Sequence, residues 1–98
     1  MKFIENKYTK WYFNLVNNAR SRPINALQGN YIEKHHIIPR SLGGSDDQDN
    51  LVALSIKEHI VCHMLLVKIT NGIDKFKMQK ALATFGKRKR IRYTSVEL

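Results

Sequence analysis

Apolar residues near the start of the chain recur with the spacing of one face of an α-helix. They fall at i, i+3, i+4, i+7, i+8 and i+11, and are Tyr8, Trp11, Tyr12, Leu15, Val16 and Ala19. Such a stripe is typical of an amphipathic helix whose apolar side faces a core. The spacing predicts a helix over about residues 6–20. We interpret its aromatic stripe as core packing rather than as a surface on which bases stack.

A pair of strands is predicted after this helix. Residues 21–30 are rich in Pro, Asn, Gln and Gly, which is typical of a loop. Residues 31–38 then have the composition of a strand, which ends at Pro39 because proline has no backbone N–H to donate. A turn-rich loop with adjacent glycines and three aspartates follows, and the apolar run 51–54 predicts the returning strand of a hairpin.

A helix with a clear start follows the hairpin. Ser55 and Glu58 have the spacing of a capping box, in which the first residue caps the helix and the second binds back to it. The helix is predicted to run to about Thr70, because Asn71 and Gly72 supply a C-terminal stop.

A last helix is predicted over residues 75–85, with Asp74 as its N-terminal cap. The residues predicted to face inward from it are Phe76, Leu82 and Phe85. Residues 87–92 form a basic tail with five Lys or Arg in six positions. The sequence has no internal repeat and no low-complexity linker, so residues 1–98 are predicted to form a single α+β domain.

The charge of the chain indicates the kind of partner. Lys and Arg number 17 against 8 Asp and Glu, for a net charge of +9, which favours a polyanion, either nucleic acid or an anionic membrane face. No apolar run approaches the roughly 20 residues that span a bilayer, and the start of the chain lacks the apolar core of a signal peptide. We therefore expect a soluble, cytoplasmic protein that acts on nucleic acid without a membrane partner.

Small domains often need a cross-link or a metal ion to stabilise a thin core. The chain has one cysteine, Cys62, so an intramolecular disulfide is excluded. A bound metal ion is therefore the expected stabilising group.

All four histidines lie between positions 35 and 63. His59 and His63 are i and i+4 on the capped helix, so both imidazoles can reach one metal ion. His35 and His36 are adjacent at the end of the predicted strand, where neighbouring residues point to opposite faces. Both face one site only if the strand end is bent, which Pro39 and the Gly-rich loop favour. One could then complete the metal site while the other stays available for chemistry.

This combination resembles the motif of the HNH (ββα-metal) endonuclease family, closest in pattern to phage-borne homing-type enzymes and colicin-type DNases. The resemblance covers residues 31–68 and is carried by Glu33-Lys-His-His-Ile-Ile-Pro-Arg-Ser-Leu-Gly-Gly, by Asp49-Asn50-Leu51 and by the His59 and His63 pair. It implies a small ββα-metal (His-Me finger) core within residues 31–70. It also implies a metal-dependent DNA endonuclease that hydrolyses phosphodiester bonds. One active site per chain predicts that it nicks its substrate.

The resemblance implies roles for individual residues. His36, three residues before Pro39, matches the general base that deprotonates the attacking water. His35, His59 and His63 match the metal ligands. Asn50 matches the middle residue of the motif, which pins the loop in some relatives and binds metal in others.

One divalent metal ion is expected, either Zn²⁺, Ni²⁺, Mn²⁺ or Mg²⁺. Three imidazoles suit zinc, nickel or cobalt better than magnesium, which prefers oxygen ligands. Cys62 could serve as a fourth ligand, although we favour the interpretation that it behaves as a small buried apolar residue.

The rival function is a non-catalytic, zinc-stabilised DNA-binding domain, in which His36 or Cys62 would close a site of four protein ligands.

Double-stranded DNA, held largely through its backbone, is the expected partner. The candidate DNA-binding residues are Arg40, Lys87, Arg88, Lys89, Arg90 and Arg92. The alternative for Arg40 is that it is a solvated surface residue without a role in binding. The alternative for the residues of the basic tail is that they form a solvated chain terminus. We expect a monomer or weak dimer in the cytoplasm, that of a host cell if a phage encodes it. A toxin-type or RNA-directed nuclease with an inhibitor protein as partner is a further alternative.

Overall fold

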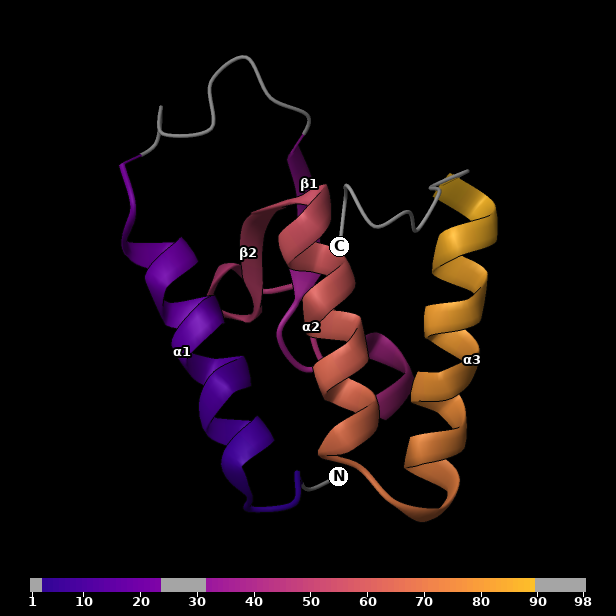
Figure 1. Ribbon diagram of the computed structural model, residues 1–98. Coiled ribbons are helices and arrows are strands. Elements are labelled where there is room, and N and C mark those ends of the chain that lie inside the picture. Colours follow the sequence, from indigo (N-terminus) through magenta and orange to yellow (C-terminus); the bar gives the residue numbers. More distant parts are fainter. Residues whose placement is uncertain (1–2, 24–31, 90–98) are drawn as a thin grey trace.

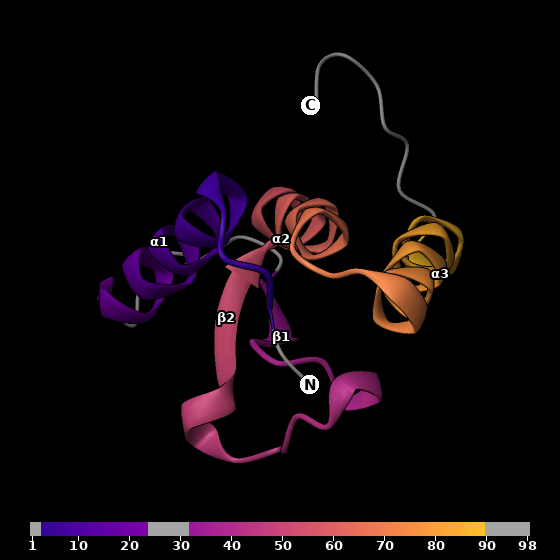
Figure 2. The same cartoon turned by 90° about the horizontal axis from the view of Figure 1, so that it is seen from below.

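The described part of the chain has three α-helices in one layer, a two-stranded hairpin and two short 3₁₀ helices between the strands. The computed structural model describes residues 3–23 and 32–89, with the backbone alone for 86–89. The α-helices and strands are α1 (Lys7–Ser21), β1 (Ile32–His36), β2 (Leu51–Ser55), α2 (Ile56–Lys68) and α3 (Gly72–Lys89), and the 3₁₀ helices span Arg40–Leu42 and Gln48–Asn50. Helix α2 lies between α1 and α3 and runs opposite to both (Figure 1). The hairpin lies on one side of this layer, against α1 and α2 (Figure 2), so the predicted α+β class is confirmed.

Helix α1 begins where the sequence pattern predicts. The side-chain oxygen of Asn6 accepts hydrogen bonds from the backbone N–H groups of Tyr8 (2.9 Å) and Thr9 (3.1 Å), which caps the first turn. Further along the helix, Tyr12, Val16 and Ala19 are buried as predicted. These three residues form the stripe that α1 packs against α2 and β2.

Trp11 was predicted to pack in the core, but 53% of it is exposed. One helical position separates it from Tyr12, a rotation of about 100°, and the neighbouring elements cover only the Tyr12 side of α1. Trp11 instead meets the ring of Tyr8 edge-on at 5.3 Å between centroids, and the ammonium of Lys7 lies 5.8 Å from its centre. Its large side chain therefore packs against its own helix.

The hairpin alternates buried and exposed residues along both strands. β1 pairs antiparallel with β2, and His35 lies opposite Val52 while His36 lies opposite Leu51. Glu33 and His35 share the buried face of β1. The strand ends at His36, two residues earlier than predicted, and its predicted first residue, Tyr31, lies outside the described residues.

The predicted capping box starts α2. The Ser55 hydroxyl accepts from the Glu58 N–H (3.2 Å), and the Glu58 carboxylate accepts from the Ser55 N–H (2.9 Å). Arg22, just after α1, donates to both Glu58 oxygens (2.7 and 2.8 Å) and to the Ala53 carbonyl (3.0 Å). This bidentate pair fixes the end of α1 to the start of α2. Helix α2 ends at Lys68, two residues earlier than predicted.

Helix α3 differs most from its prediction, because it begins at Gly72 rather than 75 and continues to Lys89 rather than 85. Gly72 has a φ of +60°, so it forms the turn and starts the next helix at once. Gly86 does not stop α3, since an internal glycine costs only about 1 kcal/mol. The first residues of the predicted basic tail therefore lie in a helix.

The inward face of α3 is also corrected. Phe85 is buried as predicted, but Phe76 is 57% exposed and Leu82 is half-buried. Met78 is buried instead, two turns before Phe85 on the same side of the helix. Phe76, nine positions before Phe85, lies on the opposite side. Within the described ranges, no helix is long and apolar enough to cross a membrane.

Candidate active site

Three histidines form a compact group between the hairpin and α2. His35 comes from β1, and His59 and His63 come from α2; their ligand nitrogens all lie within 4.8 Å of one another. The Nε2 atoms of His59 and His63 are 3.2 Å apart. Two nitrogens bound to one tetrahedral ion at about 2.0–2.1 Å would be separated by about 3.3 Å. The spacing and the imidazole donors therefore fit a divalent transition-metal ion.

A buried carboxylate orients His59. Glu33 is 6% exposed, and its Oε1 lies 2.8 Å from Nδ1 of His59. An ionised carboxylate can only accept, so His59 donates through Nδ1 and keeps the lone pair of Nε2 directed to the other histidines. Strand alternation places Glu33 on the same face as His35. The carboxylate thus selects the tautomer of His59 that can bind a metal ion.

A hydroxyl from α1 orients His35 in the same way. The fully buried Tyr12 lies with its hydroxyl 2.8 Å from Nε2 of His35, and it donates its hydrogen to the Ile37 carbonyl at 2.6 Å. His35 is therefore the donor to Tyr12, which leaves its Nδ1 lone pair available as a ligand. Burial, and then the nearby charges of His59 and His63, lower the pKa of His35 to about 2. The ring is thus neutral at physiological pH, as metal binding requires.

We expect Tyr12→Phe to weaken metal binding by about 10- to 100-fold, the usual effect of removing a partner of a ligating histidine. The buried N–H of His35 would lose its acceptor, at a cost of about 1–3 kcal/mol. Calorimetric titration with Ni²⁺ measures the affinity. Tyr8→Phe is the matched control, because Tyr8 lies one turn earlier on α1 and contacts Trp11 and Lys7. Equal affinities for the two variants would show that the Tyr12 hydroxyl has no part in the site.

His36 lies outside the histidine group but next to the same cleft. Its side chain is 29% exposed, and its Nε2 lies 2.8 Å from Oδ1 of Asp46. Arg40 approaches the same oxygen of this carboxylate, with its Nε 3.8 Å from Oδ1. The hydrogen bond from His36, and next the charge of Arg40, lower the pKa of the Asp46 carboxyl. Ionised Asp46 accepts from Nε2 of His36, so Nδ1 of His36 is left with its lone pair.

All four histidines line an open cleft of about 420 Å³ at the end of β1. Its lining residues are Lys34, His35, His36, Pro39, Arg40, His59 and His63. Adjacent strand residues point to opposite faces, yet His35 and His36 both reach this cleft because they lie at the end of the strand. His35 belongs to the histidine group, and His36 lines the cleft outside that group.

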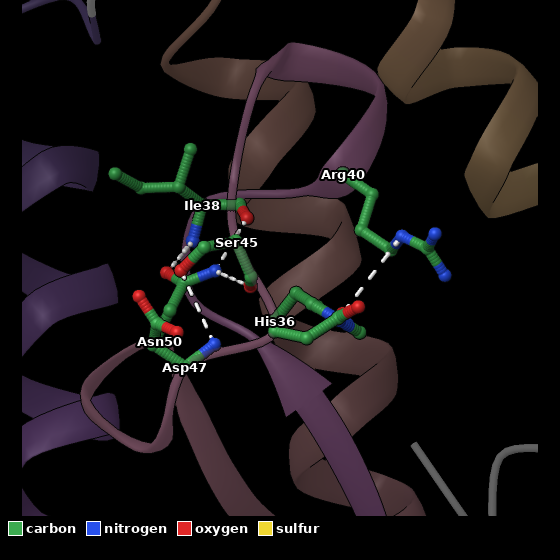
Figure 3. Close-up of polar contacts among 7 residues, drawn as sticks. His36, Ile38, Arg40, Ser45, Asp47 and Asn50 are labelled. Carbon is green, nitrogen blue, oxygen red and sulfur yellow. Dashed lines mark hydrogen bonds and ion pairs between the residues drawn. The ribbon is translucent and has the colours of Figure 1, made fainter.

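Asn50 ties together the loop that follows β1 (Figure 3). Its side-chain oxygen accepts from the Ile38 N–H (2.8 Å), and its amide donates to the carbonyls of Ile38 (3.0 Å) and Ser45 (2.7 Å). Its own backbone carbonyl accepts from the Ile37 N–H at 2.9 Å. Asn50 is 9% exposed and is not part of the histidine group. One side chain thus closes the loop that carries Arg40 and Asp46.

Gly44→Ala is expected to destabilise the loop far more than Gly43→Ala. A Cβ at Gly44 would lie 1.7 Å from the Ile38 carbonyl oxygen and 3.0 Å from the Asn50 amide, so the backbone must move. We expect a loss of at least about 3 kcal/mol, the upper end of overpacking costs. At Gly43, where φ is +95° and no atom lies within 4 Å, strain alone costs about 1–2 kcal/mol. Urea unfolding of both variants measures the difference, and equal losses would contradict this account.

The remaining candidate residues lie at the rim of the cleft, in the helices α2 and α3, or outside the described residues. The Arg40 side chain is 71% exposed. Lys87, Arg88 and Lys89 lie in the last turn of α3, and Arg90 and Arg92 lie outside the described residues. Cys62 is fully buried, and burial raises the pKa of its thiol to about 12. It is not in the histidine group.

Three residues that form hydrogen bonds with the histidines were not predicted from the sequence to be part of the site. They are Tyr12, Glu33 and Asp46. Strand alternation could have placed Glu33 beside His35, two positions later. The other two carry no such signal, since Tyr12 was predicted as an ordinary core residue and Asp46 is one of three aspartates in a loop without regular spacing.

Part of this chain is similar to known proteins. The family described as HNH endonuclease matches residues 21–63. Proteins of Enterobacteria phage T4 named probable mobile endonuclease C and D are 54% and 51% identical over 67 and 63 residues, which cover 66% and 63% of this chain. The probable mobile endonuclease E of the same phage is 48% identical over 63 residues. The chain covers 31%, 24% and 42% of the lengths of C, D and E, respectively. No solved structure matched the chain.

The matched stretch contains the parts of the site that the sequence motif specifies. It includes both strands of the hairpin, the four histidines and Asn50. The fold places the four histidines around one cleft, two from β1 and two from α2, and Asn50 closes the loop that supplies Arg40 to it, which is consistent with a ββα-metal core. Over residues 21–63, the chain therefore matches the HNH endonuclease family in its sequence and in the arrangement of its histidines.

Proposed function

We propose that the chain is the catalytic module of a metal-dependent DNA endonuclease that hydrolyses phosphodiester bonds, with His36 as its general base. One observation carries the proposal: three histidines gather their ligand atoms within 4.8 Å, while the fourth lines the same cleft outside that group. Phosphodiester hydrolysis requires both a centre that neutralises developing negative charge and a base that accepts a proton. The four histidines supply both.

DNA as the substrate is supported by charge and by the relatives. The net charge of +9 favours a polyanion, and the T4 relatives are named as endonucleases. Arg40, exposed at the rim of the cleft, is suited to contact a phosphate near the scissile bond. The basic residues of the last turn of α3 and of the predicted tail would add contacts to the DNA backbone. Such contacts make binding depend on salt and specify little sequence.

His35, His59 and His63 would hold one divalent ion. When bound, this ion would polarise the phosphoryl group and neutralise charge on the phosphate and on the leaving 3′ oxygen. Three imidazoles favour Zn²⁺ or Ni²⁺ for tight binding, and Mn²⁺ or Mg²⁺ would still support turnover. Among the described residues, neither His36 nor Cys62 belongs to the group, which favours an open site over the four-ligand structural zinc site.

His36 would perform the proton transfer. Its Nδ1 takes a proton from water as the water oxygen bonds to phosphorus and the bond to the 3′ oxygen breaks; the leaving oxygen is then protonated from solvent. Asp46 holds the Nε2–H and stabilises the imidazolium that forms. Asn50 keeps this loop in place through its hydrogen bonds to Ile38 and Ser45.

Cleavage of supercoiled plasmid tests the proposal. The protein is incubated with Mg²⁺, Mn²⁺, Ni²⁺ or Zn²⁺, and a parallel reaction contains a chelator. We expect nicked circles to form with at least one metal and not with the chelator. Because each chain has one histidine group, linear DNA should follow only later, through two nicks. Intact plasmid with every metal would contradict the proposed function.

A further inference from the structure

An aromatic ring from α3 lies against both helical histidines. The centre of the Phe85 ring is 4.7 Å from that of His59, at an interplanar angle of 89°, and 5.1 Å from that of His63, at 37°. Phe85 is 1% exposed, so the contact excludes water on that side. Phe85 lies 22 positions beyond the end of the stretch that matches the HNH family, which ends at His63. Helix α3 reaches this position because it lies beside α2 in both views (Figures 1 and 2).

The surroundings of the histidine group differ from side to side. Tyr12 and Glu33 bind the imidazoles by hydrogen bonds from α1 and β1. The cleft opens on the side of His36 and Arg40. Phe85 covers the side of α3 with a ring that has no donor atom for a metal ion and no site for a hydrogen-bonded water.

We infer that Phe85 is a positioning residue of the metal site, which holds the rings of His59 and His63 and closes the α3 side against solvent. The inference rests on the proposed function, because it assigns Phe85 a role toward the proposed ion. Any exchangeable ligand, water or phosphate, would then enter from the cleft that contains His36. The apolar wall thus directs the substrate to the general base, and it limits the number of waters that can join the three imidazoles.

Co²⁺ binding tests the inference, because cobalt bound to four ligands absorbs visible light much more strongly than cobalt bound to six. Phe85→Leu keeps an apolar side chain but removes the aromatic ring. We expect it to weaken Co²⁺ binding by about 10- to 100-fold, as for other supports of metal ligands. We also expect weaker visible absorbance per bound ion, because water enters from the α3 side.

Met78→Leu is the matched control, because Met78 is equally buried on the same face of α3 and lies two turns from the ring contact. It should bind Co²⁺ with the affinity and spectrum of the unmodified chain. Thermal unfolding without metal confirms that both variants are folded at the temperature of the titration.

The outcomes separate the two proposals. If the unmodified chain binds no Co²⁺, the proposed function fails and this inference falls with it. If the unmodified chain and Phe85→Leu bind with the same affinity and spectrum, Phe85 has no positioning role while the proposed function stands. Equal weakening in Met78→Leu would also overturn the inference, because the effect would then belong to helix packing in general.

Discussion

His36→Ala is expected to reduce the rate of plasmid nicking by about 10²- to 10⁴-fold at saturating metal, the usual contribution of a general base. The side chain lies outside the group of three ligand histidines, so the affinity for Ni²⁺ should not change. His36 is also partly exposed at the end of β1, so its removal should cost little stability. The measurements are single-turnover nicking and calorimetric titration on the same preparation.

Added imidazole offers a second readout of the base. The truncated side chain leaves space at the cleft, and a free imidazole there could take the proton that His36 would have taken. Rescue should therefore occur in His36→Ala and not in Arg40→Ala, which keeps the base. Nicking at the unmodified rate would remove the role given to His36, and loss of Ni²⁺ binding would make it a ligand instead.

His59→Ala is expected to abolish both metal binding and nicking. The change removes one of three ligands and leaves Glu33, which binds Nδ1 of His59, without this partner. At a free metal concentration of 100 times Kd, the unmodified chain should gain about 2.7 kcal/mol of stability. For a domain of this size the gain corresponds to a rise of roughly 10–20 °C in Tm. Thermal unfolding with and without Ni²⁺ should show this rise in the unmodified chain and not in the variant.

Cys62→Ala is the matched control for the ligand variant. Cys62 lies on α2 between the two helical ligands and is fully buried, but it is not in the histidine group. Its replacement should lower stability through a small cavity and keep the rise in Tm with Ni²⁺. A control that also lost this rise would identify the thiol as a fourth ligand and favour the structural zinc site.

Local sequence signals predicted the elements that carry the site. The capping box at Ser55 and Glu58 set the start of α2, and with it the common face of His59 and His63. The division of His35 and His36 into ligand and base came from the family resemblance, because strand alternation alone places adjacent residues on opposite faces. The residues of β1 do alternate between an exposed and a buried face, up to the end of the strand at His36.

The sequence could not reveal contacts that depend on tertiary packing. Tyr12 meets His35 across 23 positions, and Glu33 meets His59 across 26. No local period encodes such pairs. The exposure of Trp11 and Phe76 was mispredicted for a related reason: periodicity finds an apolar side of a helix, whereas neighbouring elements decide how much of that side is covered.

The two aromatic residues that touch the histidine group come from opposite ends of the described chain. Tyr12 lies before the stretch that matches the HNH endonuclease family, and Phe85 lies after it. A peptide consisting of the hairpin and α2 would therefore carry the same four histidines but lack a hydroxyl on one side and a hydrophobic wall on the other. Transplanting the site into another scaffold should thus require grafting α1 and α3 as well, or redesigning both flanks around the transferred histidines.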